Sequence, residues 1–206
     1  MATAIETAPI QAPAADAPFD LTIDLFSRMV ESGLIPRDRR VYLHHGRLYE
    51  KMAKTKAHGS VGAAVTRAVD RRLPEAWSLW PESTIVLDPS NAPLPDFAVI
   101  RSGDLVGRVA PDRYPGPQDV GILIEIAVTS LRDDLTSPLD QDARALIATY
   151  RVVRVAGSGY VVHSEPRVVE GRGEYAKVET YRPGQTVPLV LEGQEVARVP
   201  FEDLLR

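Results

Sequence analysis

Hydrophobic and polar residues alternate along two short runs, residues 41–44 and 47–52, on either side of His45-Gly46. Alternation with a period of two is typical of a β-strand that buries one face. Glycine readily adopts the positive φ that a tight turn between antiparallel strands requires. The segment VYLHHGRLYEKM is therefore predicted to form a β-hairpin.

Three segments repeat apolar residues every three or four positions, which is the spacing of a helix with one buried face. They cover residues 20–32, 58–73 and 138–148. Asp20 can cap the first helix, and Pro74 ends the second. In the third helix the residues expected to point inward are Leu139, Ala143, Leu146 and Ile147.

The segment DVGILIEIAV, residues 119–128, is almost continuously apolar, as is typical of a central strand covered on both faces. Further strands are predicted at residues 76–80, 84–87, 95–100, 150–155, 160–163, 174–181 and 186–191. A terminal turn of helix is expected after Pro200. This order of elements predicts an α/β (α+β) fold with a mixed central sheet flanked by helices.

Length and composition suit one domain over residues 19–206, preceded by a disordered tail over residues 1–18 that is rich in Ala and Pro. The tail has no basic segment followed by an apolar run, so it is not a signal peptide. No stretch approaches the roughly 18 apolar residues of a membrane span. We therefore expect a cytoplasmic protein that makes no membrane contact.

The chain has no cysteine, which excludes disulfides, thiolate metal sites and cysteine nucleophiles. Its net charge is −4, whereas a protein that binds the DNA backbone usually carries a basic face. Overall charge therefore gives no support for DNA binding, although a local basic patch is compatible with it.

Two acidic residues accompany predicted strands: Asp96 follows Pro95 at the start of one, and Glu125 lies inside the apolar strand. A buried carboxylate is costly unless it is paired, protonated or bound to a cation. If the two strands are adjacent, both carboxylates converge into an oxygen site suited to Mg²⁺ or Mn²⁺. In the alternative interpretation, Asp96 caps a turn and Glu125 pairs with an arginine.

The hairpin is followed by His58 at a helix start, by PLPDFAVIR, and by PGPQDVGILIEIAVTSLRDDL. The tail YVVHSEPRVVEGRGEYAKVETYRPGQTV contains an RPG turn between closing hairpins. In this order, the chain resembles the Uma-type restriction endonuclease family of the PD-(D/E)XK nuclease superfamily over roughly residues 20–206. The resemblance implies a restriction-endonuclease-like core with extra β-hairpins, and hydrolysis of DNA phosphodiester bonds that depends on Mg²⁺ (or Mn²⁺).

Residue by residue, the resemblance places Asp96 and Glu125 on the family's aspartate and glutamate, which implies that both are catalytic residues and metal ligands. Glu82 stands where the family often has glutamine, and it is a candidate third metal ligand, directly or through water. Ser130 falls on the serine after the apolar strand, and Asp134 falls on the aspartate that opens the next helix.

The match fails at two positions, because the family's lysine falls on Pro138 and its tyrosine on Asp142. In the superfamily the lysine orients the attacking water and stabilises the phosphate. Losing such an electrostatic group costs on the order of 10²–10³ in rate. Proline supplies neither charge nor donor.

Several residues are candidates to replace the lysine or to contact substrate. Lys54 and Lys56 precede the second helix, and either they supply the cation or they are solvated loop residues. Arg132 and Arg144 flank the usual position, but arginine cannot act as a base. His58 either contacts a phosphate or metal, or is a surface residue. The candidate substrate contacts are His58, Lys54, Lys56 and Ser130.

Three functions stay open on the sequence alone. The first is a metal-dependent endonuclease acting on DNA, with a homodimer favoured for cutting both strands. The second is a catalytically degenerate nuclease-fold protein that serves as a binding or assembly module, which Pro138 and the acidic net charge favour. The third is a structural protein whose carboxylates only form salt bridges. Converging carboxylates with room for an ion would keep the first two functions, whereas diverging carboxylates would leave only the third. A nearby cationic side chain would then favour the first function over the second.

Overall fold

The computed structural model describes residues 18–101, 113–128, 136–156 and 159–205. Its helices are α1 (Ile23–Glu31), α2 (Lys56–Asp70) and α3 (Thr136–Arg144), with short 3₁₀ helices at Pro117–Asp119 and Phe201–Leu204. Its strands are β1 (Val41–His44), β2 (Arg47–Glu50), β3 (Trp77–Pro81), β4 (Phe97–Arg101), β5 (Val120–Ala127), β6 (Thr149–Arg154), β7 (Gly159–Val169), β8 (Arg172–Tyr181), β9 (Thr186–Leu191) and β10 (Gln194–Pro200).

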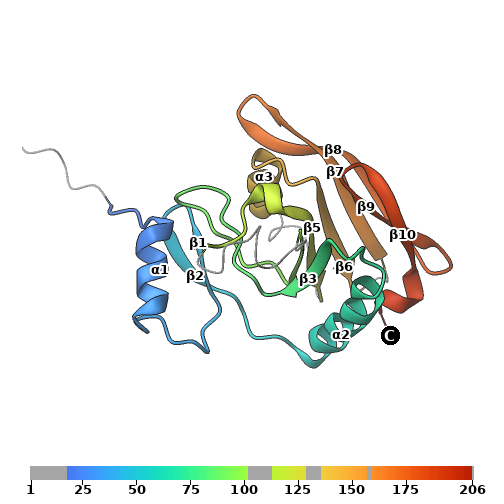
Figure 1. The fold of residues 1–206 in the computed structure, drawn as a ribbon, viewed down its shortest axis with the longest axis horizontal. Coiled ribbons are helices and arrows are strands. Elements are labelled where there is room, and N and C mark those ends of the chain that lie inside the picture. Colours follow the sequence, from blue (N-terminus) through green and yellow to red (C-terminus); the bar gives the residue numbers. More distant parts are fainter. Residues whose placement is uncertain (1–17, 102–112, 129–135, 157–158, 206) are drawn as a thin grey trace, which may run out of the picture.

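A six-stranded sheet with the order β3-β4-β5-β6-β7-β8 forms the centre of the fold (Figure 1). Only β5 and β6 run parallel, and every other neighbouring pair in this sheet is antiparallel. The pairs β1–β2 and β9–β10 form two separate hairpins. The predicted α/β fold, with a mixed sheet, flanking helices and additional hairpins, is therefore confirmed. The predicted N-terminal tail lies almost entirely outside the described residues.

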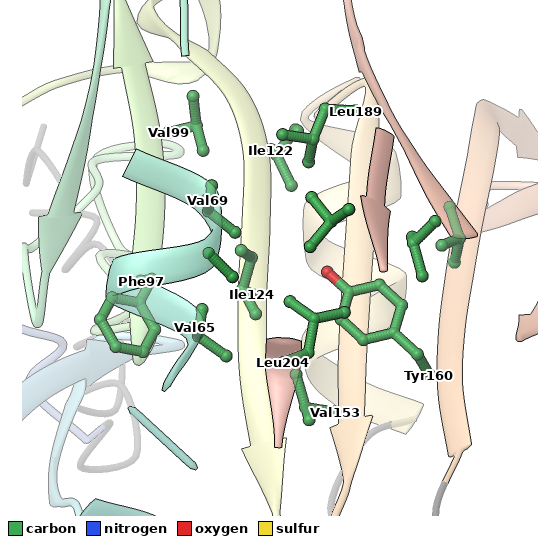
Figure 2. Packing of buried hydrophobic residues seen from close by; sticks show 14 of the residues in the cluster. Val65, Val69, Phe97, Val99, Ile122, Ile124, Val153, Tyr160, Leu189 and Leu204 are labelled. Atoms are coloured by element: carbon green, nitrogen blue, oxygen red, sulfur yellow. The ribbon is translucent and has the colours of Figure 1, made fainter. Parts of the chain in front are cut away.

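Apolar side chains cover both faces of the sheet. On one face, α2 and the β9–β10 hairpin close the larger cluster, and Figure 2 shows Val65 and Val69 of α2 beside Ile124 of β5. Strand β5 also contributes Ile122 to this cluster and Leu123 to the cluster on the opposite face, where α3 packs. The apolar run therefore forms the central strand that its composition predicts.

The β1–β2 hairpin turns at His45 and Gly46, which both have positive φ (47° and 67°), as a two-residue hairpin turn requires. Helix α1 packs on this hairpin beside the sheet (Figure 1). Leu43 of β1 and Ala92, in the loop that precedes β4, exchange two backbone hydrogen bonds of 3.2 and 2.8 Å. This pairing holds the hairpin against that loop.

One predicted strand is wrong. Residues 84–87 form no strand, although their sequence TIVL is strand-like. The amides of Ile85 and Leu87 bond to the carbonyls of Pro93 and Asn91, and the amide of Val86 bonds to that of Pro115. These few backbone bonds hold the segment in place without forming a strand.

Two helix ends also differ from the prediction. Helix α1 begins at Ile23 with Thr22 at its N-cap, so Asp20 does not cap it. Helix α3 ends at Arg144 because Leu146 has φ of +59°, and the Leu146 side chain, predicted to point inward, is 61% exposed. No helix in the described ranges is long and apolar enough to cross a membrane.

Candidate active site

The two predicted carboxylates come together at neighbouring strands. Asp96 directly precedes β4 and Glu125 lies in β5. Asp96 is 1% exposed, and its Oδ2 accepts a hydrogen bond of 2.8 Å from the backbone N–H of Ile126. The Nζ of Lys51 lies 2.9 Å from Asp96 Oδ1 and 2.9 Å from Glu125 Oε2, so both carboxylates converge on one point.

Lys51, which the sequence analysis did not select, reaches the point where the carboxylates meet. It directly follows β2, and its backbone N–H donates to the Arg40 carbonyl at 2.7 Å. Its Nζ also donates to the Leu94 carbonyl at 3.0 Å and lies 3.3 Å from Glu125 Oε1. Oxygen atoms of Leu94, Asp96 and Glu125 therefore surround the Lys51 ammonium. Lys51 follows β2, whereas Pro138 lies in α3.

The charges of Asp96, Glu125 and Lys51 depend on one another. Burial alone would raise the pKa of Asp96, but the Lys51 charge and hydrogen bonds hold it well below its usual range. Burial raises the pKa of Glu125, a rise that Lys51 opposes and Asp96 reinforces. Burial lowers the pKa of Lys51, but the two carboxylates outweigh this and raise it overall. The raised pKa of Glu125 favours its protonated form beside the Lys51–Asp96 ion pair, and a cation bound between the two acidic residues would favour its ionised form.

His58 contacts the same aspartate from α2. Its Nε2 lies 2.9 Å from Asp96 Oδ2, and its side chain is 12% exposed. Thr55 caps α2 by accepting a hydrogen bond of 3.2 Å from the His58 backbone N–H, which fixes where this helix begins. His58 is therefore held against Asp96, and the surface interpretation does not describe its position.

Glu82 lies near the pair but is engaged by cations. It forms ion pairs with Arg40 and with Lys54, whose Nζ is 3.0 Å from Glu82 Oε1. In the ranges that the structure describes, no group of three or more His, Asp or Glu side chains is arranged to hold a metal ion. Glu82 as a third ligand stays a prediction, and its contacts favour a role in positioning Arg40 and Lys54.

The other predicted residues lie elsewhere. Lys56 is exposed in the first turn of α2. Arg144 pairs with Asp140 on its own helix, with Nε 2.9 Å from Oδ2. Three predicted positions, Ser130, Arg132 and Asp134, lie outside the described residues.

A cleft of about 480 Å³ opens over the site, and Lys51, Asp96 and Glu125 line it. Asp142 of α3 and Tyr150 of β6 also line this cleft. Burial raises the pKa of Asp142 to about 8. The cleft therefore joins a charged end at the carboxylate pair to an uncharged end beneath α3.

Comparison with known proteins identifies the group to which the chain belongs. The Uma2 family model, described as "Putative restriction endonuclease", matches residues 24–199. A crystal structure of a "putative nuclease belonging to DUF820" from Anabaena variabilis ATCC 29413 is similar at a TM-score of 0.57 and 10% identity. The likeness covers 80% of this chain and 89% of that one, and at this identity it shows the fold. No curated protein matches. Because the family model spans most of the folded chain, the protein belongs to the Uma2 family.

Proposed function

We propose that this protein is an endonuclease that hydrolyses DNA phosphodiester bonds with Mg²⁺ or Mn²⁺ at the Asp96–Glu125 pair. The observation that carries the proposal is the Lys51 ammonium between these carboxylates, because it supplies a cation that Pro138 cannot. The family and the nuclease fold support the same class of reaction.

The oxygen atoms that surround the Lys51 ammonium suit a hard divalent cation. Mg²⁺ is commonly held by one or two carboxylates together with waters and substrate phosphates. Asp96 and Glu125 would supply the carboxylates, and the Leu94 carbonyl offers a further oxygen. When bound, such an ion acts as a Lewis acid on the phosphate and lowers the pKa of water.

Lys51 and a metal ion cannot occupy the same point, because Mg²⁺ binds oxygen at about 2.1 Å whereas the ammonium lies 2.9 Å from both carboxylates. We expect Lys51 to leave the carboxylates when the cation arrives and to donate to a phosphate oxygen of the substrate. A lysine suits this role because its ammonium is compact and its stem is flexible.

His58 and Ile126 would position Asp96 for this role. Both contact Asp96 Oδ2, while Oδ1 is the atom that faces the Lys51 ammonium. Holding one carboxylate oxygen fixes the direction of the other, which is how neighbouring groups orient metal ligands. His58 therefore acts through Asp96 as a positioning residue.

Phosphates of the substrate would meet Arg40 and Lys54 at the rim of the cleft. Both are paired with Glu82, and their side chains are 21% and 31% exposed. A phosphate must compete with Glu82 for them, so we expect weak, salt-sensitive DNA binding. A homodimer stays part of the proposal, because cutting both strands requires two sites.

Two rival functions have observations in their favour. Pro138 and Asp142, at the family's lysine and tyrosine positions, favour a degenerate member that binds without cutting. The contacts of Lys51 would also serve a purely structural ion pair, although a structural pair does not require an open cleft above it.

The experiment is nicking of supercoiled plasmid with Mg²⁺ or Mn²⁺, comparing the wild type, Asp96→Asn and the control Asp24→Asn on α1. The proposal expects nicking that requires metal, is lost in Asp96→Asn and is retained in Asp24→Asn. Absence of nicking by folded wild type at high protein concentration would support the degenerate member. Equal nicking by wild type and Asp96→Asn would place the activity elsewhere.

A further inference from the structure

Two buried polar atoms at the floor of the cleft have no hydrogen-bond partner among the residues that the structure describes. They are Oδ1 of Asp142 and the hydroxyl oxygen of Tyr150. The two residues are 3% and 1% exposed, and both line the same cleft as Glu125. Buried polar atoms are nearly always hydrogen-bonded in folded proteins. A pair of unsatisfied atoms beneath an open cleft therefore indicates a bound group that satisfies them.

Rigid elements hold this floor in place. Gly173 of β8 donates its backbone N–H to Asp140 Oδ1 of α3 at 2.8 Å, and a Cβ at Gly173 would lie 2.1 Å from the Asp140 carbonyl oxygen. Gln141 Nε2 donates to Asn91 Oδ1 at 2.8 Å, which ties α3 to the loop beside the hairpin. Asp142 lies between these anchored residues, and β6 supplies the second group of the floor from the central sheet.

The floor presents uncharged groups at neutral pH. Burial raises the pKa of Asp142 to about 8, so its carboxyl keeps its proton. Burial also raises the pKa of Tyr150 well above its ordinary value, with contributions from Glu125 and Asp142. A protonated carboxyl offers an O–H donor beside a C=O acceptor, and the phenol offers a further O–H.

Most of the wall of this cleft is apolar. Its apolar members include Pro93, Leu94, Pro95, Leu123, Val128 and Pro138. Apolar walls with a few convergent polar atoms are typical of sites for flat, largely uncharged ligands. A charged phosphate suits such walls poorly, whereas an aromatic ring fits against them with its polar edge on the floor.

We propose that this floor binds the edge of a nucleobase next to the scissile phosphate. Because its ligand is part of a nucleic acid, this assignment rests on the proposed function. Every base presents a hydrogen-bond donor beside an acceptor on one edge, either an amino group beside a ring nitrogen or a ring N–H beside a carbonyl. Such a pair matches the acceptor and donor of the Asp142 carboxyl.

The geometry also defines the form of the substrate. A base inside an intact duplex is stacked and cannot enter a pocket, so the bound base must be unpaired or turned out of the helix. Asp142 and Tyr150 would then be binding residues that position the phosphodiester bond over Asp96 and Glu125.

The test is saturation-transfer NMR of the full chain without metal, using deoxyadenosine, deoxycytidine and thymidine as probes and 2-deoxyribose, which lacks a base, as the control. We expect the wild type to bind the nucleosides and not 2-deoxyribose. Asp142→Leu should weaken nucleoside binding about tenfold, which is the order of effect that a paired base contact provides. Asp142→Asn, whose amide keeps a donor and an acceptor, should retain nucleoside binding, and Tyr150→Phe should weaken it.

The outcome separates this site from the nuclease proposal, because the measurement requires no cleavage. Equal binding of the nucleosides and 2-deoxyribose, no binding of any nucleoside, or unchanged nucleoside binding by Asp142→Leu would overturn the base site. If Asp142→Leu fails to fold, nucleoside binding by the wild type is compared with that by Tyr150→Phe, and equal binding by these two proteins would overturn the base site. A wild type that binds nucleosides but not 2-deoxyribose, and that nicks no plasmid, would keep the base site and remove the nuclease.

Discussion

Asp96 and Asp142 line the same cleft and are almost equally buried, with 1% and 3% of their surfaces exposed. The carboxylate of Asp96 is contacted by Lys51 and His58, and its pKa lies well below the usual range. Within the described part of the chain, no cation contacts Asp142 and its Oδ1 has no partner, and burial raises its pKa to about 8. Neighbouring charges, rather than burial, therefore decide whether an aspartate in this cleft is ionised.

This difference divides the cleft into two chemical regions. The end at Asp96 and Glu125 gathers charges around one point, which suits a cation and a phosphate. The end at Asp142 and Tyr150 gathers neutral hydrogen-bonding groups, which suits an uncharged ring edge. Substitutions in one region at a time show how cleavage, stability and binding depend on each end of the cleft.

The largest effect is expected from Lys51→Met at the charged end. Removing a preorganised cation that stabilises the reacting phosphate should lower the rate of plasmid cleavage on the order of 10²–10³. Lys177→Met is the matched control, because Lys177 of β8 pairs with Glu179 and does not line the cleft. Equal effects of the two substitutions, measured as single-turnover rates, would show that Lys51 is only one of several surface cations.

The next effect concerns stability and should appear in Asp142→Asn. Below pH 3.8, its ordinary pKa, the Asp142 carboxyl is protonated in the folded and in the unfolded chain. Between pH 3.8 and about pH 8 it ionises only when the chain unfolds. Wild-type stability therefore falls relative to the variant by about 1.4 kcal/mol per pH unit in this window. We measure the free energy of unfolding of both proteins by denaturant unfolding at pH 5 and at pH 7. The difference, variant minus wild type, should rise by about 2–3 kcal/mol from pH 5 to pH 7.

A constant difference between wild type and Asp142→Asn at the two pH values would contradict a neutral Asp142. Asp96 should behave with the opposite sign. Its lowered pKa means that its carboxylate stabilises the folded chain above about pH 4, and this contribution is lost as the pH falls further.

The smallest effect is expected from Glu82→Gln. The substitution releases Arg40 and Lys54 from partly exposed ion pairs, which are worth roughly 0–1 kcal/mol each. DNA binding measured by fluorescence anisotropy should tighten up to about fivefold, and cleavage should change little. Loss of cleavage comparable to that in Asp96→Asn would instead make Glu82 a metal ligand.

Local pattern was sufficient to predict much of the fold. The His45-Gly46 turn and the apolar run of β5 are specified by backbone freedom and by burial on two faces. The strand predicted at residues 84–87 failed because β-branched and apolar residues favour an extended backbone, whereas a strand also requires a ladder of hydrogen bonds to a neighbouring segment. That neighbour depends on the arrangement of distant segments.

The candidate site was predictable only in part for the same reason. The pairing of β4 with β5 brings Asp96 to Glu125, as proposed from their places in adjacent strands. Lys51 was missed because its contacts span 45 and 74 residues and depend on how the hairpin pairs with Ala92. Its place at the end of a predicted strand, in a chain with few lysines, was the available signal.

Asp142 was passed over although a signal existed. It lies three residues after Leu139 and one before Ala143, both expected to face inward, so helical spacing places it on the buried face. A buried aspartate on an otherwise apolar face requires an explanation in the same way as Glu125 does. Its lack of a partner could be seen only after the sheet and α3 were placed together.

The central claim is that Asp96 and Glu125 form a cation site that Lys51 occupies in the absence of metal. The most direct test is Mn²⁺ binding followed by electron paramagnetic resonance in the wild type, Lys51→Met and the double variant Asp96→Asn/Glu125→Gln. We predict that the wild type binds Mn²⁺, that Lys51→Met binds it more tightly because the competing ammonium is gone, and that the double variant does not bind it. Equal Mn²⁺ binding by the folded wild type and the folded double variant would contradict the claim.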